Sequence, residues 1–226
     1  MNRFSINLCK VVFTLAALVT LGLSQAQAAP VVLTFEGLGD NEQVLNYYNG
    51  GFGGNGSGPG PNYGITFGPD SLALIGSYAG GSGNFTNPPS GDTVMYFLSG
   101  PGDVMNVAAG FNTGFSFFYA DQVGFTGSVT VWSGLNGTGT ELASLTLPST
   151  PDPYNVWVPV GVAFAGTAQS VIFGGSANFI GFDNITLGAS TPGGVVPEPS
   201  SLTLLGIGAF GLIGLVRRRR KAAVAA

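Results

Sequence analysis

The central part of this 226-residue chain lacks positive charge. Residues 29–196 contain no Lys, Arg or His but ten Asp and Glu, so this part carries a formal charge of −10, whereas the whole chain sums to −4. Proteins bind nucleic acids and phosphate groups mainly through cationic side chains that displace condensed counterions. The composition therefore excludes nucleic-acid binding by this part of the chain.

The same absence removes most catalytic chemistry. Without His, Lys or Cys in residues 29–196, Ser-His-Asp and Cys-His catalysis, Schiff-base chemistry and His-based zinc sites are excluded. Paired carboxylates, as in glycoside hydrolysis, remain. Ten acids place some pair at a suitable distance by chance, and Asp is common in turns for backbone reasons alone. We therefore expect a protein that is not an enzyme.

Salt bridges between side chains cannot form within residues 29–196, because cations are missing there. A buried carboxylate in this part must be satisfied by backbone N–H groups, by a proton or by a metal ion. Among metal ions, Ca²⁺ suits a ligand set made only of oxygen atoms.

Cysteine is almost absent, and the one cysteine, Cys9, lies in a segment with the layout of a secretory signal. Positive charge precedes an apolar run at 11–23, and a small-x-small sequence follows at 26–28. A 13-residue run is too short to span about 30 Å of hydrocarbon as a helix. The sequence therefore predicts a signal peptide at 1–28 and an exported protein without disulfides.

Short runs rich in β-branched and aromatic residues fill the middle of the chain, separated by Gly, Pro, Asn and Asp. They predict one all-β domain at 29–188, a β-sandwich of the jelly-roll type, followed by a linker at 189–195. The expected strands lie at 31–35, 64–67, 72–75, 93–98, 115–119, 128–132, 141–147, 156–160, 171–173 and 182–187. A glycine-rich segment at 49–64 is expected to be a surface loop, either functional or a plain connector.

Two acids stand out by their place in the expected first and last strands. Glu36 follows Phe35 at the end of the first strand, and Asp183 lies in the sequence Phe-Asp-Asn-Ile of the last strand. This pair resembles the opening and closing motifs of carbohydrate-binding jelly rolls. The resemblance implies a structural Ca²⁺ held by Glu36 and Asp183, with Asp40 as a further ligand. The alternative is that Glu36 faces solvent and Asp183 is a turn residue.

Carbohydrate binding would also need exposed aromatic faces that stack on sugar rings. Tyr47, Tyr48, Phe52 and Tyr63 flank or lie in the glycine-rich segment, and the three tyrosines are the candidate contacts. Further candidates are Trp132, Tyr154 and Trp157. Since most aromatic residues of a β-sandwich belong to its core, a core position is the alternative for each of them.

The C-terminal segment contains 17 uncharged residues at 200–216, between Pro-Glu-Pro and a run of four Arg and one Lys. This pattern predicts a short transmembrane helix whose basic end stays in the cytoplasm. Residues 206–211 match the dinucleotide-binding string G-x-G-x-x-G. A binding site of that kind needs a preceding strand and a later acidic residue, and both are missing, so nucleotide binding is excluded.

Together, the Pro-Glu-Pro sequence, the apolar span and the basic run at 196–221 resemble the PEP-CTERM sorting signal of exported bacterial proteins. The resemblance implies that exosortase, a membrane-embedded processing enzyme, recognises Pro197, Glu198 and Pro199. It also implies transient anchoring in the membrane, then a place at the cell surface or in the extracellular matrix.

We therefore expect a structural or adhesive protein associated with exopolysaccharide. A Ca²⁺-dependent carbohydrate-binding module is the alternative, and a carboxylate-dependent glycosidase is the least favoured reading.

Overall fold

A computed structural model describes residues 29–193 of the chain. The predicted signal peptide at 1–28, the sorting signal at 196–221 and its helix at 200–216 lie outside the described residues. Within residues 29–193, no helix is both long and apolar enough to cross a membrane.

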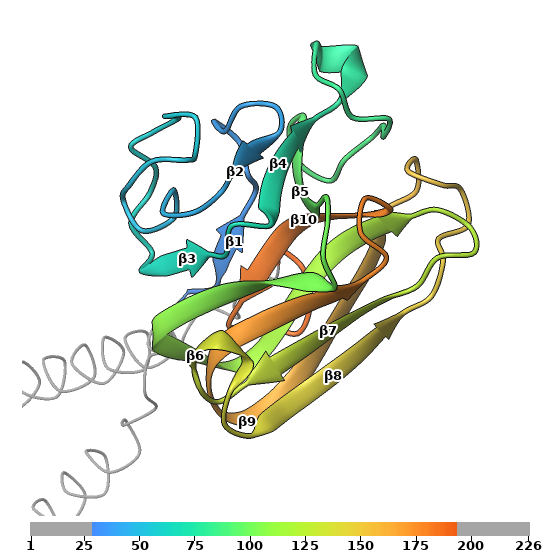
Figure 1. Cartoon of the computed structure of the whole chain (residues 1–226). Helices are drawn as coiled ribbons and strands as arrows, with labels where there is room; N and C mark the ends of the chain where they lie inside the picture. The colour runs from blue at the N-terminus through green and yellow to red at the C-terminus, as the bar shows by residue number, and fades with distance from the viewer. Residues whose placement is uncertain (1–28, 194–226) are drawn as a thin grey trace, which may run out of the picture. The chain divides into compact units, whose positions relative to one another are not determined.

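The described part is built from antiparallel strands that belong to one continuous sheet (Figure 1). Their order is β2-β4-β5-β10-β6-β9-β7-β8, with β1 paired to β10 and β3 paired to β6. The strands are β1 (Val31–Leu33), β2 (Glu42–Gln43), β3 (Ile65–Phe67), β4 (Ser71–Ile75), β5 (Thr93–Phe97), β6 (Gly102–Asp121), β7 (Gly127–Trp132), β8 (Glu141–Leu147), β9 (Val158–Gly175) and β10 (Ile180–Leu187), with short 3₁₀ turns η1 (Ser77–Ala79) and η2 (Leu135–Gly137).

Two long strands, β6 and β9, fold this sheet into two layers. The first part of β6, residues 102–106, pairs with residues 170–174 of β9, and the second part, residues 113–119, pairs with residues 158–164. The register shifts between these two stretches, where both strands bend. One layer continues through β10, β5, β4 and β2, and the other continues through β7 and β8.

Aromatic side chains from the two layers meet between them. Phe173 of β9 lies against Phe117 of β6 and Phe182 of β10, with ring centroids 6.3 and 5.0 Å apart, and all three side chains are fully buried. Edge-to-face contacts of this kind add to the free energy gained by burying the rings. The predicted all-β sandwich is confirmed.

The strand limits differ from those expected in one important way. The expected strands at 156–160 and 171–173 belong to one strand, β9, and the expected strand at 115–119 is only the second half of β6. The sequence between the two parts of β9 contains Gly166, whose φ is 94°. A glycine between two apolar runs is typical of a turn. Here the glycine bends a strand that continues into the second layer.

The start of the expected linker packs on the domain. The Ser116 hydroxyl donates a hydrogen bond to the Ala189 carbonyl at 2.9 Å, and the Gly193 N–H donates one to the Thr186 hydroxyl at 3.1 Å. A Cβ at Gly114 would come within 2.6 Å of the Ser190 nitrogen. Residues 189–193 therefore lie close against β6 and β10.

Candidate functional site

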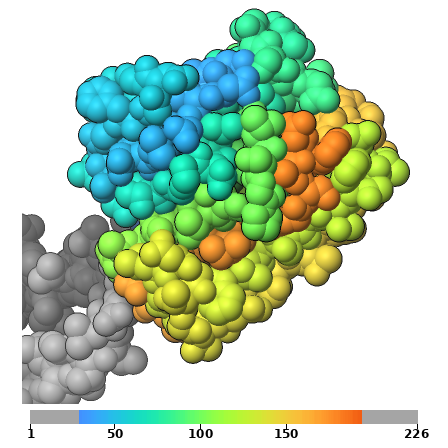
Figure 2. Space-filling model, viewed as in Figure 1, coloured from blue at the N-terminus to red at the C-terminus, as the bar shows by residue number. Residues whose placement is uncertain are grey.

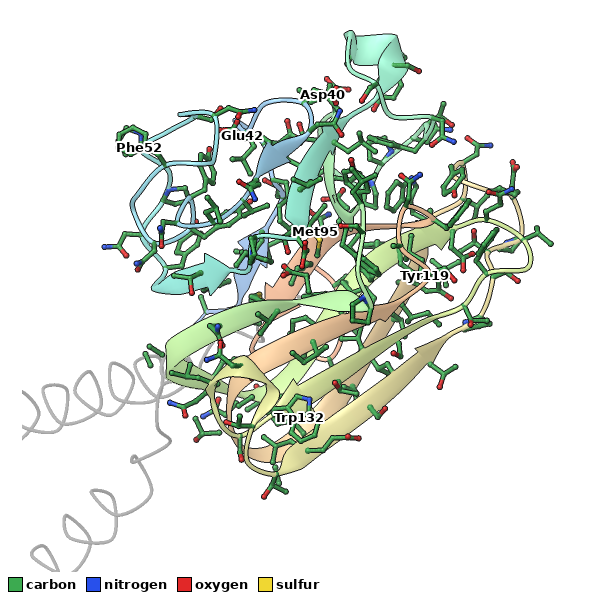
Figure 3. The ribbon with its side chains drawn as sticks, viewed as in Figure 1. Asp40, Glu42, Phe52, Met95, Tyr119 and Trp132 are labelled. Atoms are coloured by element: carbon green, nitrogen blue, oxygen red, sulfur yellow. The ribbon has the colours of Figure 1, made fainter. Side chains whose placement is uncertain are left out.

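The glycine-rich segment, residues 49–64, is held by one buried carboxylate. Glu42 is fully buried, and its carboxylate accepts hydrogen bonds from the N–H groups of Gly39, Asn55 and Ser57 at 2.6, 2.9 and 3.0 Å. These hydrogen bonds keep the pKa of Glu42 below its ordinary value, although burial opposes them. Figure 3 shows Glu42 inside this segment and Phe52 at its outer edge. The segment is thus an ordered loop clamped by Glu42.

Glu36 and Asp183, the two predicted metal ligands, hold one segment between them. Oε1 of Glu36 accepts hydrogen bonds from the N–H groups of Asp92 and Thr93 at 3.0 and 2.9 Å. Asp183 accepts hydrogen bonds from the N–H and hydroxyl of Ser90 at 2.8 and 2.9 Å. Burial raises the pKa of Asp183 to about 7 against the effect of these donors, and the charge of Glu36 contributes to the rise.

Asp40, the third predicted ligand, has a different role. Its carboxylate accepts hydrogen bonds from the N–H groups of Ile75 and Ser82 at 2.9 and 3.1 Å. Among residues 29–193, no three His, Cys, Asp or Glu side chains lie close enough to hold one metal ion. The three carboxylates therefore do not gather at one point among these residues, and a calcium site that includes Glu36 and Asp183 stays a prediction.

Two of the predicted carbohydrate contacts are core residues. Tyr47 and Tyr48 are 8% and 3% exposed. The Tyr47 hydroxyl donates to the Glu36 carbonyl at 2.9 Å, and the Tyr48 hydroxyl accepts from the Phe35 N–H at 2.6 Å. Neither ring can present a face to a sugar, so this expectation is corrected. Tyr63 is 46% exposed and stacks on Tyr48, so its role as a sugar contact remains a prediction.

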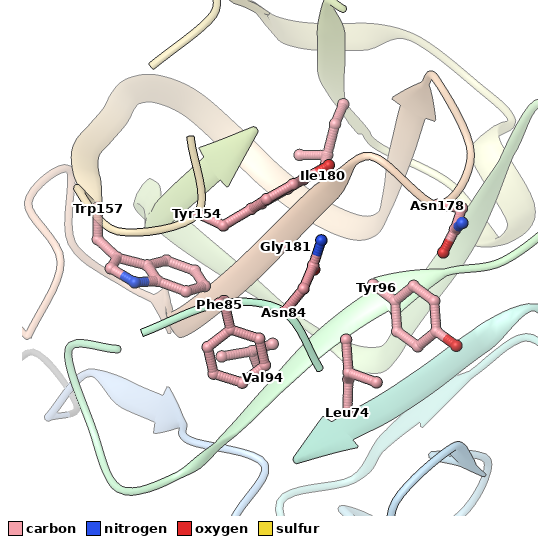
Figure 4. A pocket seen from close by; sticks show the side chains of 10 residues that line it. All are labelled: Leu74, Asn84, Phe85, Val94, Tyr96, Tyr154, Trp157, Asn178, Ile180 and Gly181. Carbon is pink, nitrogen blue, oxygen red and sulfur yellow. The ribbon is translucent and has the colours of Figure 1, made fainter. Parts of the chain in front are cut away.

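A cleft lies instead on the outer face of β4, β5 and β10 (Figure 4). Its larger compartment has a volume of about 430 Å³ and continues into a smaller one of about 40 Å³. The residues that line both compartments are Leu74, Asn84, Tyr96, Tyr154 and Asn178. We call this feature the outer cleft. Figure 2 shows the molecule in a space-filling view from the same side as Figure 1.

Strand alternation explains why β5 contributes to the cleft. Met95 and Phe97 point into the core, so the alternate residues Val94 and Tyr96 point to the opposite face of the sheet. All five residues of β5 are nevertheless buried, because other segments cover this outer face. These segments lie before β5 and before β9, and they supply Phe85 and Trp157 to the cleft.

The two covering segments are bonded to each other. The Trp157 indole N–H donates to the Thr86 carbonyl at 3.0 Å, and the Thr86 N–H donates to the Tyr154 carbonyl at 2.8 Å. The hydroxyl of Thr86 donates to the Asn155 side chain at 2.6 Å. The rings of Phe85 and Trp157 meet edge to face at 5.8 Å. The wall of the cleft is therefore built in advance of any ligand.

Uncharged polar groups converge on the larger compartment. The Tyr96 hydroxyl donates to the Asn41 amide oxygen, and the Asn41 amide donates to the Ser82 hydroxyl at 2.7 Å. The side-chain amides of Asn84, Gln122 and Asn178 are exposed there and have no hydrogen-bond partner among residues 29–193. The cleft thus combines aromatic surfaces with side-chain amides that are free to bind.

Sequence reasoning found part of this site. Tyr154 and Trp157 were among the further aromatic candidates and do line the cleft, whereas Trp132 lies on β7, where its indole N–H donates to the Thr130 hydroxyl. Tyr96, Asn84 and Asn178 were missed. They come from separate segments, and no motif in the sequence marks them.

Comparison with known proteins identifies the C-terminal segment. Residues 195–221 match the PEP-CTERM protein-sorting motif. This confirms the sorting signal predicted at 196–221, and the motif indicates an exported precursor that an exosortase-type enzyme processes. No curated protein matches the chain.

Several solved structures resemble the described domain. A mutant of the carbohydrate-binding module CBM29-2 is 12% identical, with 75% of this chain and 98% of that module covered and a TM-score of 0.41. CsCBM6-3 from Clostridium stercorarium, solved with cellobiose, is 17% identical, with 55% and 87% covered and a TM-score of 0.37. These structures belong to the group that the strand motifs resemble.

An enzyme also appears among the similar structures. The glycoside hydrolase family 43 arabinoxylan arabinofuranohydrolase from Bacillus subtilis is 18% identical, with a TM-score of 0.36 and 53% of this chain covered. The chain spans only 24% of that enzyme's length. Likeness of this extent says nothing about ligands, so the assignment of a ligand rests on the geometry of the outer cleft.

Proposed function

We propose that this chain is an exported, non-catalytic carbohydrate-binding protein whose ligand occupies the outer cleft. One observation carries the proposal: aromatic side chains and unpaired amides from separate segments converge on one cleft with a pre-built wall. Concave sites that combine aromatic surface with a few placed polar groups are typical of small-ligand binding. Sugar rings offer apolar faces and hydroxyl groups, which match the two kinds of lining.

The lining supports binding and not hydrolysis. The described residues that line the cleft are all uncharged. Glycoside hydrolysis by the usual route needs two carboxyl groups on either side of the scissile bond. The carboxylates of Asp40, Glu42 and Asp183 accept backbone hydrogen bonds that hold loops in place. We therefore assign them a structural role.

The sorting motif supports the place of action. Export followed by exosortase processing would deliver the domain to the cell surface or the matrix, where binding to exopolysaccharide would make it an adhesive component. Recognition of Glu198 is tested by Glu198→Ala, which we expect to leave the full-length precursor in the membrane fraction. Normal processing of this variant would contradict the role of Glu198.

The cleft itself is tested by glycan binding. We expect Tyr154→Ala to weaken binding about tenfold, the loss expected when a central aromatic contact is truncated. Tyr63→Ala and Phe52→Ala remove exposed aromatic rings from the glycine-rich segment and serve as matched controls that should leave the affinity unchanged. Thermal melts of all three variants verify that they fold.

The opposite pattern would place the ligand elsewhere. Loss of binding in Tyr63→Ala together with a neutral Tyr154→Ala would move the site to the glycine-rich segment. No measurable binding to any glycan, including the producer's own exopolysaccharide, would reject carbohydrate binding.

Calcium dependence is a second and separate proposal. It is supported by the approach of Glu36 to Asp183, because both carboxylates hold residues 90–93 and the charge of one raises the pKa of the other. No Lys, Arg or His in residues 29–196 can neutralise the pair. We expect 1 mM Ca²⁺ to raise the melting temperature relative to EDTA, and equal melting temperatures would reject the site.

A further inference from the structure

The outer cleft lies in a negative electrostatic environment. Its lining is uncharged, and the charged groups next to the lining are carboxylates. Asp40 binds the side-chain amide of Asn41 at 3.0 Å and the N–H of Ser82 at 3.1 Å, and both Asn41 and Ser82 line the cleft. Asp121, which directly precedes the lining residue Gln122, is fully buried, and burial raises its pKa. A ligand in the cleft therefore lies near the Asp40 carboxylate and near no cation of residues 29–193.

The two tyrosines of the cleft sense these acids. Burial is the main cause that raises the pKa of Tyr96, and the charge of Asp40 adds to it. Burial likewise raises the pKa of Tyr154, and the charge of Asp121 adds to it. The hydrogen bonds that Asp40 accepts from Asn41 and Ser82 thus place negative charge beside the lining of the cleft.

The free polar groups of the cleft suit hydroxyl groups. A side-chain amide, as in Asn84, Gln122 and Asn178, offers both a donor and an acceptor, and a sugar hydroxyl needs both. A carboxylate only accepts hydrogen bonds, and strong binding of a carboxylate uses Arg or Lys. The oxygen atom of each side-chain amide is an acceptor, so it cannot form a hydrogen bond with an ionised carboxylate, which has only acceptors.

We infer that the outer cleft selects neutral glycan chains and rejects chains of uronic acids. This inference rests on the proposed carbohydrate binding and names the class of ligand that the same cleft accepts. Acidic exopolysaccharide would be bound only where neutral sugar units interrupt its charged units.

The test uses pairs of tetrasaccharides that differ only in oxidation at C6. Cellotetraose, mannotetraose and galactotetraose are each compared with the corresponding tetrauronate, in EDTA, by calorimetry on the full-length protein in detergent. We expect at least one neutral tetrasaccharide to bind and its uronate partner to bind about tenfold more weakly, because like charges placed together oppose binding. Equal or tighter binding of the uronate would overturn the inference.

A positive charge added to the cleft sharpens this test. Gln122→Lys places a cation at the exposed mouth of the cleft, and we expect it to narrow the preference for the neutral chain about threefold or more. This effect of Gln122→Lys on the preference should vanish in 1 M salt, where the Debye length is about 3 Å. Ser144→Lys makes the same change in net charge on β8, the edge strand farthest from β2 in the sheet, and is the matched control.

The outcomes distinguish a failure of carbohydrate binding from a failure of charge selection. If no tetrasaccharide of either kind binds, the proposed carbohydrate binding fails. If glycans bind but the uronate is preferred, or if Ser144→Lys shifts the preference as much as Gln122→Lys does, carbohydrate binding stands and charge selection by the cleft is rejected. A uronate that binds only when Ca²⁺ replaces EDTA would be held through the metal ion, and rejection of uronates by the cleft itself would stand.

Discussion

The glycine-rich segment and the outer cleft use the same kinds of residue in opposite ways. Beside the glycine-rich segment, Tyr47 and Tyr48 are buried, and backbone N–H groups of the segment donate hydrogen bonds to Glu42. In the outer cleft, Tyr154 is half-buried, and the amides of Asn84 and Asn178 are left free. The first region uses its polar groups to hold its own backbone, whereas the second keeps them for a ligand.

This difference shows how a domain without cations stabilises its loops. Several carboxylates accept hydrogen bonds from backbone N–H groups, among them Glu42 from the glycine-rich segment, and Glu36 and Asp183 from residues 90–93. Hydrogen bonds to a charged group are roughly twice as strong as those between neutral groups. Clamps of this kind replace the salt bridges that the composition forbids.

The largest effect is expected when the Glu42 carboxylate, which holds the glycine-rich segment, is removed. Glu42→Ala leaves the N–H groups of Gly39, Asn55 and Ser57 without their acceptor. At about 1 kcal/mol or more for each unsatisfied donor, the free energy of unfolding should fall by about 3 kcal/mol. The melting temperature should then fall by about 6–12 °C, as measured by calorimetry or circular dichroism.

The control for this variant is Glu141→Ala, which removes an exposed carboxylate at the start of β8 and should change the stability by less than about 0.5 kcal/mol. Glycan affinity should be unchanged in Glu42→Ala at temperatures where the protein is folded. A stable Glu42→Ala variant, or one that loses glycan binding while folded, would contradict the division between the two regions.

The buried carboxylates should respond to acid in opposite directions. Burial raises the pKa of Asp183 to about 7, so the folded protein takes up a proton near pH 7, whereas the unfolded chain does so only near pH 4. Stability therefore rises as the pH falls from 8 to 5, by about 2 kcal/mol. Asp103, whose pKa burial raises to about 6, changes stability in the same direction.

Glu42 gives the opposite sign because its pKa is lowered in the folded protein. Below pH 4.5 the unfolded chain binds the proton first, and stability falls with the pH. Urea unfolding between pH 8 and pH 3 should show a maximum near pH 5. If the stability declines steadily from pH 8 downward, burial does not raise the pKa values of Asp183 and Asp103 in the folded protein.

The sequence predicts the layers of this fold better than it predicts its site. Alternating and β-branched runs locate most strands, because burial on one face imposes that pattern. Absence of cations predicts that backbone N–H groups are among the partners of buried carboxylates, as Glu42 shows. The bend within β9 was missed because a glycine that bends a strand and one that ends it look alike.

The cleft could not be predicted, since it depends on long-range register. Tyr96 lines it only because Met95 faces Phe182 in the core, which turns its neighbour outward. Asn178 and Tyr154 reach the same place from different connections between strands. Tyr47 and Tyr48 lie beside a conspicuous glycine-rich segment, and that proximity favoured the wrong tyrosines.

The smallest expected effect concerns the wall of the cleft. Trp157→Phe keeps an aromatic ring against Phe85 but removes the indole N–H that donates to the Thr86 carbonyl. We expect a loss of about 1 kcal/mol in stability, the ordinary net contribution of one hydrogen bond. Amide hydrogen exchange should become faster at residues 84–87, and glycan affinity should fall a few-fold, because part of the wall must then be ordered on binding. Exchange in the glycine-rich segment, which Glu42 holds independently, should not change. If exchange increased equally in both regions, the wall of the cleft and the glycine-rich segment would form one cooperative unit. The glycine-rich segment would then not be held independently by Glu42.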